Sequence, residues 1–470
     1  MELNWEQKKV LKIQYRPIVV IAGPGTGKTR TLVAKLQNLI TSQKNNPSKI
    51  LALTFTRKAS QEIKERLKDN FKNKAFIGTF HSLAFQFVSQ VEQFEIENDE
   101  DYERLLLEFL ELLKNKKINL NFSHVLVDEF QDTSEVQYEI LKIISPKNII
   151  VIGDPYQSIY SFRGANFGIF EAFKKDFPEY REIKLSENYR SYKNITTVSQ
   201  KLFPEITKLH NIKKEEGEVK LIEFLNHKAE ADFIVSTIMS GTGGVDLNSV
   251  NEGDQKFSDF AVIYRNHFLR ESVENALKQS GIPYQMVGGG SIWEKKETKS
   301  LIEKIKKYEG REDKLSKLVK KFSEDSEILS LVKRFDKYKD GIKRFLEYVE
   351  DLEGREFYDP NLNCVTLLTM HASKGLEFEN VFIIGFEENF NEKRSDIDEE
   401  KRLLYVSMTR AKQKLYLMYS RRRNGKVMKV SRFLKDLRDE KLIEMIDPKM
   451  EKIIKRIERK KLKKAQISLF

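Results

Sequence analysis

Ala22-Gly23-Pro24-Gly25-Thr26-Gly27-Lys28-Thr29 is the most informative segment of this chain. The apolar residues 19–21 before it predict a buried strand, and Lys28 and Thr29 open a predicted helix. In such a glycine-rich turn, backbone N–H groups surround phosphate oxygens, the lysine reaches the outer phosphates and the threonine hydroxyl holds Mg²⁺. Ala22 replaces the first glycine of the strict pattern, so a glycine-rich turn without a ligand is the alternative.

Two adjacent carboxylates, Asp128 and Glu129, follow a second apolar run at residues 125–127. They begin the segment Asp-Glu-Phe-Gln-Asp, which ends at residue 132. One carboxylate at such a position binds Mg²⁺, and the other activates a water molecule for attack on a phosphorus atom. Together with the phosphate loop, this pair predicts hydrolysis of a nucleoside triphosphate.

The composition is that of a polar globular protein, with 33% charged and 40% hydrophobic residues in 470. The net charge of +12 favours a polyanionic partner such as nucleic acid, although a lysine-rich protein without such a partner is the alternative. Cys364 is the single cysteine, which excludes an intrachain disulfide and fits a reducing cytoplasm. No signal pattern and no apolar run of about 18 residues is present, so we expect no membrane segment.

Short apolar runs alternate with charged segments of helical character along the chain. This alternation predicts parallel sheets covered by helices, arranged in two α/β domains. Residues from about 86 to 121 and from about 298 to 360 lack strand patterns and predict helical insertions; the first is too short for an independent domain. The apolar runs are residues 18–21, 50–54, 125–127, 149–152, 261–264, 365–369, 381–384 and 415–419.

Further short motifs occur along the chain in one order. In that order and spacing they resemble the UvrD/Rep/PcrA family, the superfamily 1A DNA helicases, from about residue 3 to residue 435. Superfamily 2 RNA helicases fit poorly, because their third and sixth motifs differ. The motifs are LNWEQ at 3–7, TFTRKA at 54–59, GTFHS at 78–82, GDPYQSIYSFRG at 153–164, ENYRS at 187–191, YRN at 264–266, GIPY at 281–284 with GG at 288–289, TMHASKGLEF at 369–378 and RLLYVSMTRA at 402–411.

The resemblance implies two RecA-like parallel-sheet motor domains with short helical insertions, and ATP with Mg²⁺ between the motor domains. The expected ranges are 1–180 for the first motor domain, 181–297 with 361–454 for the second, 298–360 for a reduced accessory insertion, and 455–470 for a basic tail. In relatives the accessory domains grip duplex DNA and regulate unwinding. Their reduction here leaves ATPase activity and translocation as firm expectations and makes autonomous unwinding an open question.

For the nucleotide, the resemblance implies contacts along the whole phosphate loop, Ala22 to Thr29, and with the adenine ring. Gln7 is expected to read the adenine edge, while Arg30 and Tyr189 sandwich the ring. Glu377 is expected near the ribose or the phosphates.

For the chemistry, the resemblance implies that Thr29 and Asp128 hold Mg²⁺ and that Glu129 is the general base. Gln157 is expected to sense the γ-phosphate. Arg190 and Arg410 are expected as arginine fingers from the second domain, so that the site is complete only when the cleft closes. The alternative for either arginine alone is a surface ion pair.

For DNA, the resemblance implies a single strand lying across both domains, with aromatic faces stacking on bases and basic groups following phosphates. Phe162 stands where tryptophan is usual, and it presents a smaller stacking face. Core packing is the alternative for Phe55 and Phe162. Binding should tolerate any sequence and weaken with salt. The matching positions are Phe55, Thr79, His81, Tyr160, Phe162 and Arg163.

Residues 421–426, Arg-Arg-Arg-Asn-Gly-Lys, contain the Asn-Gly pair that favours a two-residue β-hairpin. In relatives a hairpin at this place is the pin that splits the duplex. This one is basic and has no aromatic residue near its tip, so a plain surface hairpin is an equal alternative.

The chain ends in Gln466-Ile467-Ser468-Leu469-Phe470, which is similar to the short bacterial peptide that docks in the sliding-clamp pocket. Leu469 and Phe470 would enter a hydrophobic pocket, and the Gln466 amide would fix the start of the peptide. The alternative is an apolar end packed back on the protein. A clamp peptide would place the protein in a bacterium, or in a phage or element that uses a bacterial clamp.

The sequence therefore predicts an ATP-dependent 3′→5′ DNA helicase and single-stranded DNA translocase of DNA repair or replication. Its partners are single-stranded DNA, single-strand/duplex junctions and a sliding clamp, in the bacterial cytoplasm at the nucleoid. The direction comes from the resemblance alone. The alternatives are a translocase that displaces proteins and needs a partner to unwind, and a catalytically inactive DNA- or clamp-binding adaptor.

Overall fold

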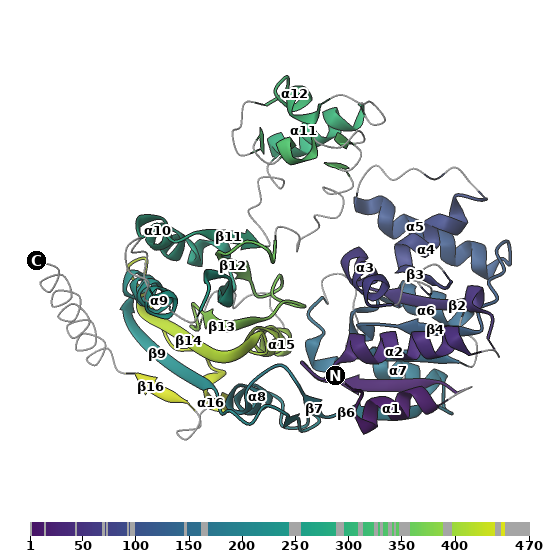
Figure 1. Cartoon of the computed structure of the whole chain (residues 1–470), viewed down its shortest axis with the longest axis horizontal. Coiled ribbons are helices and arrows are strands. Elements are labelled where there is room, and N and C mark those ends of the chain that lie inside the picture. Colours follow the sequence, from purple (N-terminus) through teal and green to yellow (C-terminus); the bar gives the residue numbers. More distant parts are fainter. Residues whose placement is uncertain are drawn as a thin grey trace, which may run out of the picture. The chain divides into compact units, whose positions relative to one another are not determined.

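Two units make up the chain: Met1–Glu216 with Ser395–Tyr405, and Gly217–Arg394 with Val406–Phe470. We call them unit 1 and unit 2 and describe each by itself, using a computed structural model of the protein (Figure 1). The described residues are 2–13, 16–42, 45–67, 71, 74–91, 94, 99–144, 148–160, 168–243, 255–287, 296–308, 314–323, 328–329, 332–336, 341–342, 345–346, 358–388, 397–437 and 443–446.

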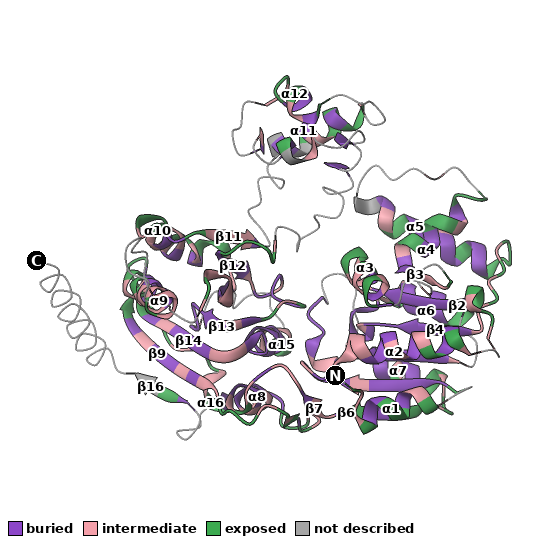
Figure 2. Cartoon of the chain, viewed as in Figure 1, coloured by how far each residue is buried: buried purple, intermediate pink, exposed green. Residues whose placement is uncertain are grey.

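A six-stranded sheet forms the centre of unit 1, and all of its strand pairs are parallel. The inner strands are continuous apolar runs, as expected where helices cover both faces of a sheet, and Figure 2 shows them buried. The strand order is β3-β2-β4-β5-β1-β6. The strands are β1 (Ile18–Ala22), β2 (Ile50–Thr54), β3 (Phe76–Thr79), β4 (His124–Val127), β5 (Ile149–Gly153) and β6 (Arg181–Leu185).

Two apolar cores lie on the two faces of this sheet. Successive residues of a strand point to opposite faces, so Val19 belongs to one core and Val20 to the other. Helices α1, α2 and α3 contribute to the core of Val20, and α4, α5, α6 and α7 to the core of Val19. The helices are α1 (Trp5–Lys12), α2 (Lys28–Thr41), α3 (Arg57–Arg66), α4 (Phe80–Val88), α5 (Asp99–Lys114), α6 (Glu135–Ile144), α7 (Ile169–Asp176) and α8 (Lys193–Gln200).

Helix α5 lies in the first stretch that the sequence predicts to be a helical insertion. Leu105, Phe109 and Leu112 are buried, and they join the same core as Leu83 of α4. A buried aliphatic side chain contributes about 1.5–3 kcal/mol by leaving water, so these contacts bind α5 to the sheet. The insertion shares the core of unit 1. The remaining short elements of unit 1 are η1 (Pro47–Lys49), η3 (Phe130–Asp132), η4 (Pro155–Gln157), β7 (Glu187–Asn188) and β8 (His210–Asn211).

Unit 2 is built on an eight-stranded sheet, which is parallel except for the pairing of β15 with β14. The main path is β11-β12-β10-β13-β14-β9-β16. Phe382 and Tyr416 stack in its core, with ring centroids 4.7 Å apart. The strands are β9 (Glu218–Asn226), β10 (Phe260–Tyr264), β11 (Tyr284–Val287), β12 (Val365–Thr369), β13 (Phe378–Ile383), β14 (Ala411–Arg423), β15 (Lys426–Val427) and β16 (Glu444–Ile446).

Helices α9 (His227–Thr242) and α10 (Glu271–Gln279) pack on this sheet through Ile234 and Val273. Helix α15 (Ile397–Met408) begins in unit 1 and ends in unit 2. Other elements are η6 (Phe257–Asp259), η7 (His267–Leu269), α11 (Lys296–Lys306), α12 (Leu315–Val319), η9 (Lys333–Phe335) and α16 (Leu434–Leu437).

The second helical insertion has an apolar core of its own. Leu301 and Ile305 of α11, Leu315 and Leu318 of α12, and Phe345 are buried together there. The structure describes this segment only in pieces between residues 296 and 346, and in those pieces there is no strand.

The α/β fold class with parallel sheets is confirmed, and a strand overlaps each predicted apolar run. The first unit extends further than the expected boundary at residue 180, because β6 pairs with β1 and residues up to Glu216 belong to unit 1. Within the described part of the chain, no helix is both long and apolar enough to cross a membrane.

Candidate active site

The carboxyl ends of β1, β5 and β4 bring the phosphate loop and the carboxylates to one edge of the unit 1 sheet. These strands are neighbours in the order β4-β5-β1 and all run parallel. Parallel sheets bind their ligands at this edge. Ala22 ends β1, Gly153 ends β5, and Asp128 follows β4 directly.

The loop depends on glycine at two positions. Gly25 and Gly27 have φ values of +72° and +82°, a region that strains other residues. A Cβ atom on Gly25 would lie 2.6 Å from Asn188 Nδ2 and 2.7 Å from Arg190 Cβ. The loop is therefore closely packed by the segment around Asn188.

The threonine and lysine of the loop fold over its own carbonyl groups. Thr26 Oγ1 donates to the carbonyl of Gly23 at 2.8 Å, and Lys28 Nζ donates to the carbonyl of Ala22 at 3.3 Å. Lys28 and Thr29 are partly exposed at the start of α2. The lysine therefore lies over the loop in which phosphate oxygens would bind.

Asp128 is a buried carboxyl group, with 4% of its surface exposed. Burial and then the charge of Glu129 raise its pKa to about 7, and the charge of Lys28 acts in the opposite direction. The ionised form of such a carboxyl group is stabilised when a divalent cation binds beside it. Proteins hold Mg²⁺ with one or two carboxylates plus substrate phosphates, and Asp128 beside the phosphate loop is a carboxylate of this kind.

Glu129 adopts a left-handed backbone conformation with φ +48°, which is uncommon for a residue with a side chain. Its backbone N–H donates to Asp128 Oδ1 at 3.0 Å. Strain of this kind is tolerated where the surroundings fix the residue, and it is frequent at active sites. The backbone conformation thus fixes the positions of the Asp128 and Glu129 carboxylates relative to each other.

Gln131 is a site residue to which the sequence analysis gave no role. Its Nε2 donates to Glu129 Oε2, and its Oε1 accepts from the backbone N–H of Asp154 at 2.9 Å. The side chain is buried, and Gly153 leaves room for it, since a Cβ there would lie 2.2 Å from Gln131 Oε1. One amide group therefore joins the carboxylate after β4 to the segment after β5. Its only signal in the sequence is its place beside the carboxylate pair.

Gln157 lies in the short helix η4 and faces a second buried carboxyl. Its Nε2 donates to Asp154 Oδ2 at 2.7 Å. Burial raises the pKa of Asp154, and the charge of Lys28 acts in the opposite direction. Since Lys28 acts on both Asp128 and Asp154, the structure brings the predicted residues Lys28, Asp128, Glu129 and Gln157 together in unit 1.

The segment that carries Arg190 is hydrogen-bonded to the phosphate loop. Asn188 Nδ2 donates to the carbonyl of Pro24 at 2.7 Å, and the Tyr189 N–H donates to the carbonyl of Gly25 at 2.9 Å. Asn188 Oδ1 accepts from the N–H of Arg190 at 3.1 Å. The sequence predicts Arg190 on the second domain, whereas contacts place it in unit 1. Asn188, which organises the segment, was not singled out from the sequence.

The predicted adenine contacts gather around the start of α1. Gln7 is fully buried, and its Nε2 donates to the carbonyl of Thr26 at 3.1 Å. Asn4 Nδ2 donates to the Tyr189 hydroxyl at 3.0 Å. Burial raises the pKa of Tyr189, and the charge of Arg30 lowers it. Arg30 therefore lies near the Tyr189 ring. Gln7 thus supports the loop, and its reading of adenine stays a prediction.

Arg410 and Glu377 belong to unit 2. Arg410 has 2% of its surface exposed, and its Nε donates to the carbonyl of Val406 at 2.8 Å. Its Nη1 donates to the carbonyl of Leu376 at 3.3 Å. Glu377 is exposed and pairs with Lys412 at 3.2 Å. Backbone carbonyl groups of unit 2 therefore hold the guanidinium group of Arg410 in place.

Of the predicted DNA contacts, Phe55 and Tyr160 stack on each other, with ring centroids 5.4 Å apart and 16° between the planes. Thr79 caps α4 by accepting from the Ser82 N–H at 3.1 Å. His81 packs edge-on to a neighbouring tyrosine ring of α5. Phe162 and Arg163 lie outside the described residues, as do Gln466, Leu469 and Phe470 of the tail.

His81 was expected among the DNA contacts. Burial, followed by the charge of Arg57, lowers its pKa to about 4. The imidazole is therefore neutral at pH 7, so it offers a hydrogen bond or a ring face to DNA and no positive charge.

The predicted Asn-Gly hairpin is present in unit 2. Strands β14 and β15 pair antiparallel through Arg423 and Lys426. Asn424 and Gly425 have φ values of +50° and +78°, the combination that a two-residue type I′ turn requires. Arg421 is exposed and pairs with Glu223, with Nη2 and Oε2 2.9 Å apart. Arg423 is buried, so only part of the basic run faces solvent.

Two family models match the chain, and together they cover most of it. The UvrD/REP helicase N-terminal domain matches residues 3–93 and 88–178. The UvrD-like helicase C-terminal domain matches residues 183–328 and 303–422.

Among curated proteins, the ATP-dependent DNA helicase Rep of Buchnera aphidicola (subspecies Schizaphis graminum) is 27% identical, over 94% of this chain and 97% of that protein. The ATP-dependent DNA helicase PcrA of Staphylococcus aureus (strain Mu50) is 26% identical, over 93% of this chain and 86% of that protein. The alignment with Rep runs over 650 positions, whereas this chain has 470 residues, so the relative contains segments that this chain lacks.

Proposed function

Since the chain belongs to the UvrD/REP helicase family, we propose that it is an ATP-dependent DNA helicase that moves 3′→5′ along single-stranded DNA in repair or replication. One observation carries the ATP-hydrolysing part. Lys28, Asp128, Glu129 and Gln157 share one edge of the unit 1 sheet: Glu129 is hydrogen-bonded to Asp128, Gln157 to Asp154, and the charge of Lys28 acts on both aspartates.

In the proposed reaction, Lys28 and the loop N–H groups hold the phosphates of ATP. Asp128 and Thr29 hold Mg²⁺, which neutralises charge on the phosphate oxygens. Glu129 accepts a proton from the attacking water, and Gln131 keeps its carboxylate in place. Gln157 contacts the γ-phosphate, and Arg190 and Arg410 stabilise the charge that develops there.

Single-stranded DNA is the proposed track. Phe55, which is partly exposed and stacks on the buried Tyr160, is proposed to offer a ring face to bases, which suits binding without sequence preference. The short insertions support a second candidate within the same chemistry, a translocase that needs a partner to unwind. We further propose that the protein works at single-strand/duplex junctions near the bacterial nucleoid.

A steady-state ATPase assay tests the proposed function first. We expect hydrolysis to require Mg²⁺. We expect its rate to rise when single-stranded DNA is added, because in the proposed function ATP hydrolysis drives movement along the strand. An adaptor with an inactive motor would bind the strand without hydrolysing ATP, and that result would overturn the proposal.

Gln131→Leu should lower the turnover number for ATP by about 10- to 100-fold with little change in the Michaelis constant, because a misplaced base slows only the chemical step. The measurement is phosphate release at saturating ATP and DNA. Gln137→Leu is the matched control, since Gln137 of α6 is also buried but accepts its hydrogen bond from the N–H of Ser134, just before α6. Equal losses in both variants would show a general packing effect and contradict the positioning role.

Deleting residues 466–470 should abolish capture of the purified bacterial sliding clamp and leave DNA-stimulated ATPase unchanged. Loss of two apolar anchor residues typically weakens such a contact by about 10- to 1000-fold. The double variant Lys463→Ala/Lys464→Ala controls for the adjacent basic charge and should still bind. Clamp binding by the truncated protein would refute the tail assignment.

A further inference from the structure

The hairpin of β14 and β15 projects an exposed tip from the unit 2 sheet. Asn424, Gly425 and Lys426 are exposed, and Val427 has 75% of its surface exposed. A tip that presses on a base pair must keep a fixed angle to the sheet, because a hinged tip would yield to the load. What holds the base of the hairpin is therefore a functional question.

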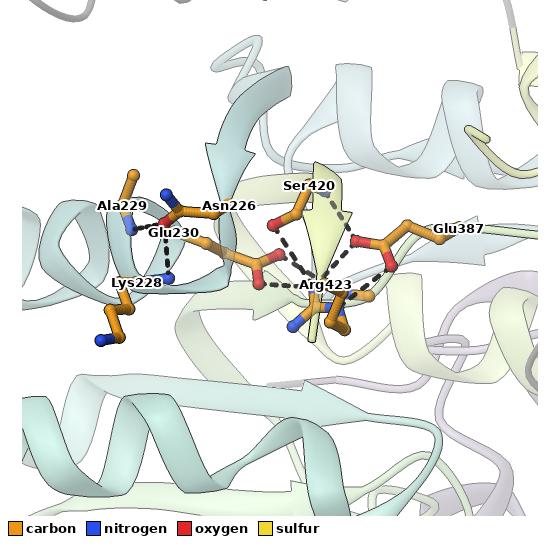
Figure 3. Close-up of polar contacts among 8 residues, drawn as sticks. Asn226, Lys228, Ala229, Glu230, Glu387, Ser420 and Arg423 are labelled. Atoms are coloured by element: carbon orange, nitrogen blue, oxygen red, sulfur yellow. Dashed lines mark hydrogen bonds and ion pairs between the residues drawn. The ribbon is translucent and has the colours of Figure 1, made fainter. Parts of the chain in front are cut away.

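A buried ionic cluster, which we call the anchor triad, holds that base (Figure 3). It consists of Arg423 at the end of β14, Glu230 of α9 and Glu387 after β13. Arg423 Nη2 lies 2.7 Å from Glu230 Oε2 and 2.8 Å from Glu387 Oε1, and Arg423 Nε donates to Glu387 Oε2 at 3.0 Å. Arg423 and Glu230 have 5% and 1% of their surface exposed.

Backbone groups extend the triad into the sheet. Glu387 Oε1 also accepts from the N–H of Ser420 in β14 at 2.6 Å, and Glu230 Oε1 accepts from the N–H of Gly385 at 3.4 Å. One guanidinium thus ties the hairpin to a helix and to the loop after a neighbouring strand. The planar fork of arginine fixes direction as well as distance.

The other side of the hairpin base is not held by close packing. A cavity of about 460 Å³ lies there, between α9 and α10. Arg423 and Asn424 line it, together with polar side chains such as Asp232 and Asn275. The hairpin base therefore borders a hollow on this side, and the hydrogen bonds of the triad hold Arg423 beside it.

A stability role alone does not explain the triad. Replacing a buried ion cluster with apolar residues of the same volume is often neutral or stabilising, because desolvation offsets the attraction between charges. Two carboxylates surround one guanidinium, and burial raises the pKa of Glu230 to about 7. Burying these charges costs free energy in the folded state. What the cluster provides is a fixed position of the Arg423 side chain relative to Glu230 and Glu387.

We propose that Arg423, Glu230 and Glu387 are positioning residues that fix the angle of the hairpin so that its tip can separate the first base pair of a duplex. The inference rests on the proposed helicase function and deepens it. In this proposal the triad couples movement along the single strand to separation of the duplex.

The test compares Arg423→Met with Arg421→Met in the full chain. Both arginines lie in β14 and pair with carboxylates, but only Arg423 is buried. For Arg423→Met we expect translocation and DNA-stimulated ATPase within about twofold of wild type and unwinding of a 3′-tailed duplex reduced by about tenfold or more. Arg421→Met should leave all three rates unchanged. Equal unwinding by Arg423→Met and wild type would overturn the proposal.

A neutral triple variant keeps the test valid if Arg423→Met folds poorly, because that change leaves two buried carboxylates without their partner. The variant Arg423→Met/Glu230→Gln/Glu387→Gln removes all three charges together. We expect its thermal unfolding temperature to recover towards wild type while unwinding stays low. Recovery of unwinding together with stability would show a structural role only and would overturn the proposal.

A fluorescent 2-aminopurine in the first base pair of the same duplex separates the two possible failures. Wild type bound to this junction should raise the fluorescence by opening the pair, and the triple variant should not. If wild type neither opens the pair nor unwinds, both the helicase function and the anchor role fail. If wild type opens it and the triple variant does so equally, the anchor role alone fails.

Discussion

Glu129→Gln should reduce DNA-stimulated ATP hydrolysis by about 10²–10⁴-fold, the contribution typical of a general base. The amide keeps the size of the side chain and its hydrogen bond with Gln131 but cannot accept the proton of the attacking water. Nucleotide and single-strand binding should stay close to wild type, because neither depends on that proton. Phosphate-release kinetics, a fluorescent ATP analogue and strand-binding anisotropy give the three measurements.

The matched control for this variant is Glu135→Gln, the same chemical change on an exposed residue of α6. It should hydrolyse ATP at the wild-type rate. Lys28→Ala is a companion variant that should also lose hydrolysis and retain strand binding, because it removes the charge that faces the phosphates. Unchanged turnover in Glu129→Gln would refute the role given to this carboxylate.

Arg410→Ala should lower the turnover number by about 10³–10⁵-fold, the range for an arginine that stabilises a transferring phosphoryl group. ATP affinity should change little, because the finger acts on charge that develops only in the transition state. Single-turnover hydrolysis and nucleotide titration measure the two effects separately.

Folding must be controlled in this experiment, because Arg410 is buried and donates to the carbonyls of Val406 and Leu376. Thermal unfolding of Arg410→Ala shows whether unit 2 stays intact. Arg432→Ala removes an exposed arginine of the same unit that pairs with Glu388, and it should keep full turnover. A defect of Arg410→Ala confined to ATP affinity would contradict the finger role.

The inner strands of the unit 1 sheet, and β10 and β12 of unit 2, could be predicted from the sequence because each is buried on both faces and therefore reads as an apolar run. The inner strand β9 was not predicted, because its buried residues alternate with partly exposed ones. Strand β6 also escaped prediction. Its sequence, Arg-Glu-Ile-Lys-Leu, alternates charged and apolar residues, as suits a strand at the edge of a sheet with only Ile183 and Leu185 buried. Residues 187–191 follow β6 within unit 1, beyond the expected boundary at residue 180.

The candidate site could be predicted as a set of residue types, and the hydrogen bonds among them could not. Lys28, Asp128 and Glu129 stand in patterns whose chemistry requires them. Gln131 and Asn188 act by reaching across from one segment to another, to Asp154 and to Pro24. That reach depends on strand order and on loop conformation, which residue spacing does not encode. The neutral state of His81 likewise follows from burial, which the motif does not reveal.

Stopped-flow unwinding of two duplexes, one with a 3′ single-stranded tail and one with a 5′ tail, tests the proposed 3′→5′ helicase function. Both duplexes have the same base pairs, and each is measured with ATP and Mg²⁺ under a single-turnover trap. A 3′→5′ helicase should separate the 3′-tailed duplex and leave the 5′-tailed one intact. Separation of the 5′-tailed duplex alone, or of neither while the strand stimulates no hydrolysis, would contradict this function.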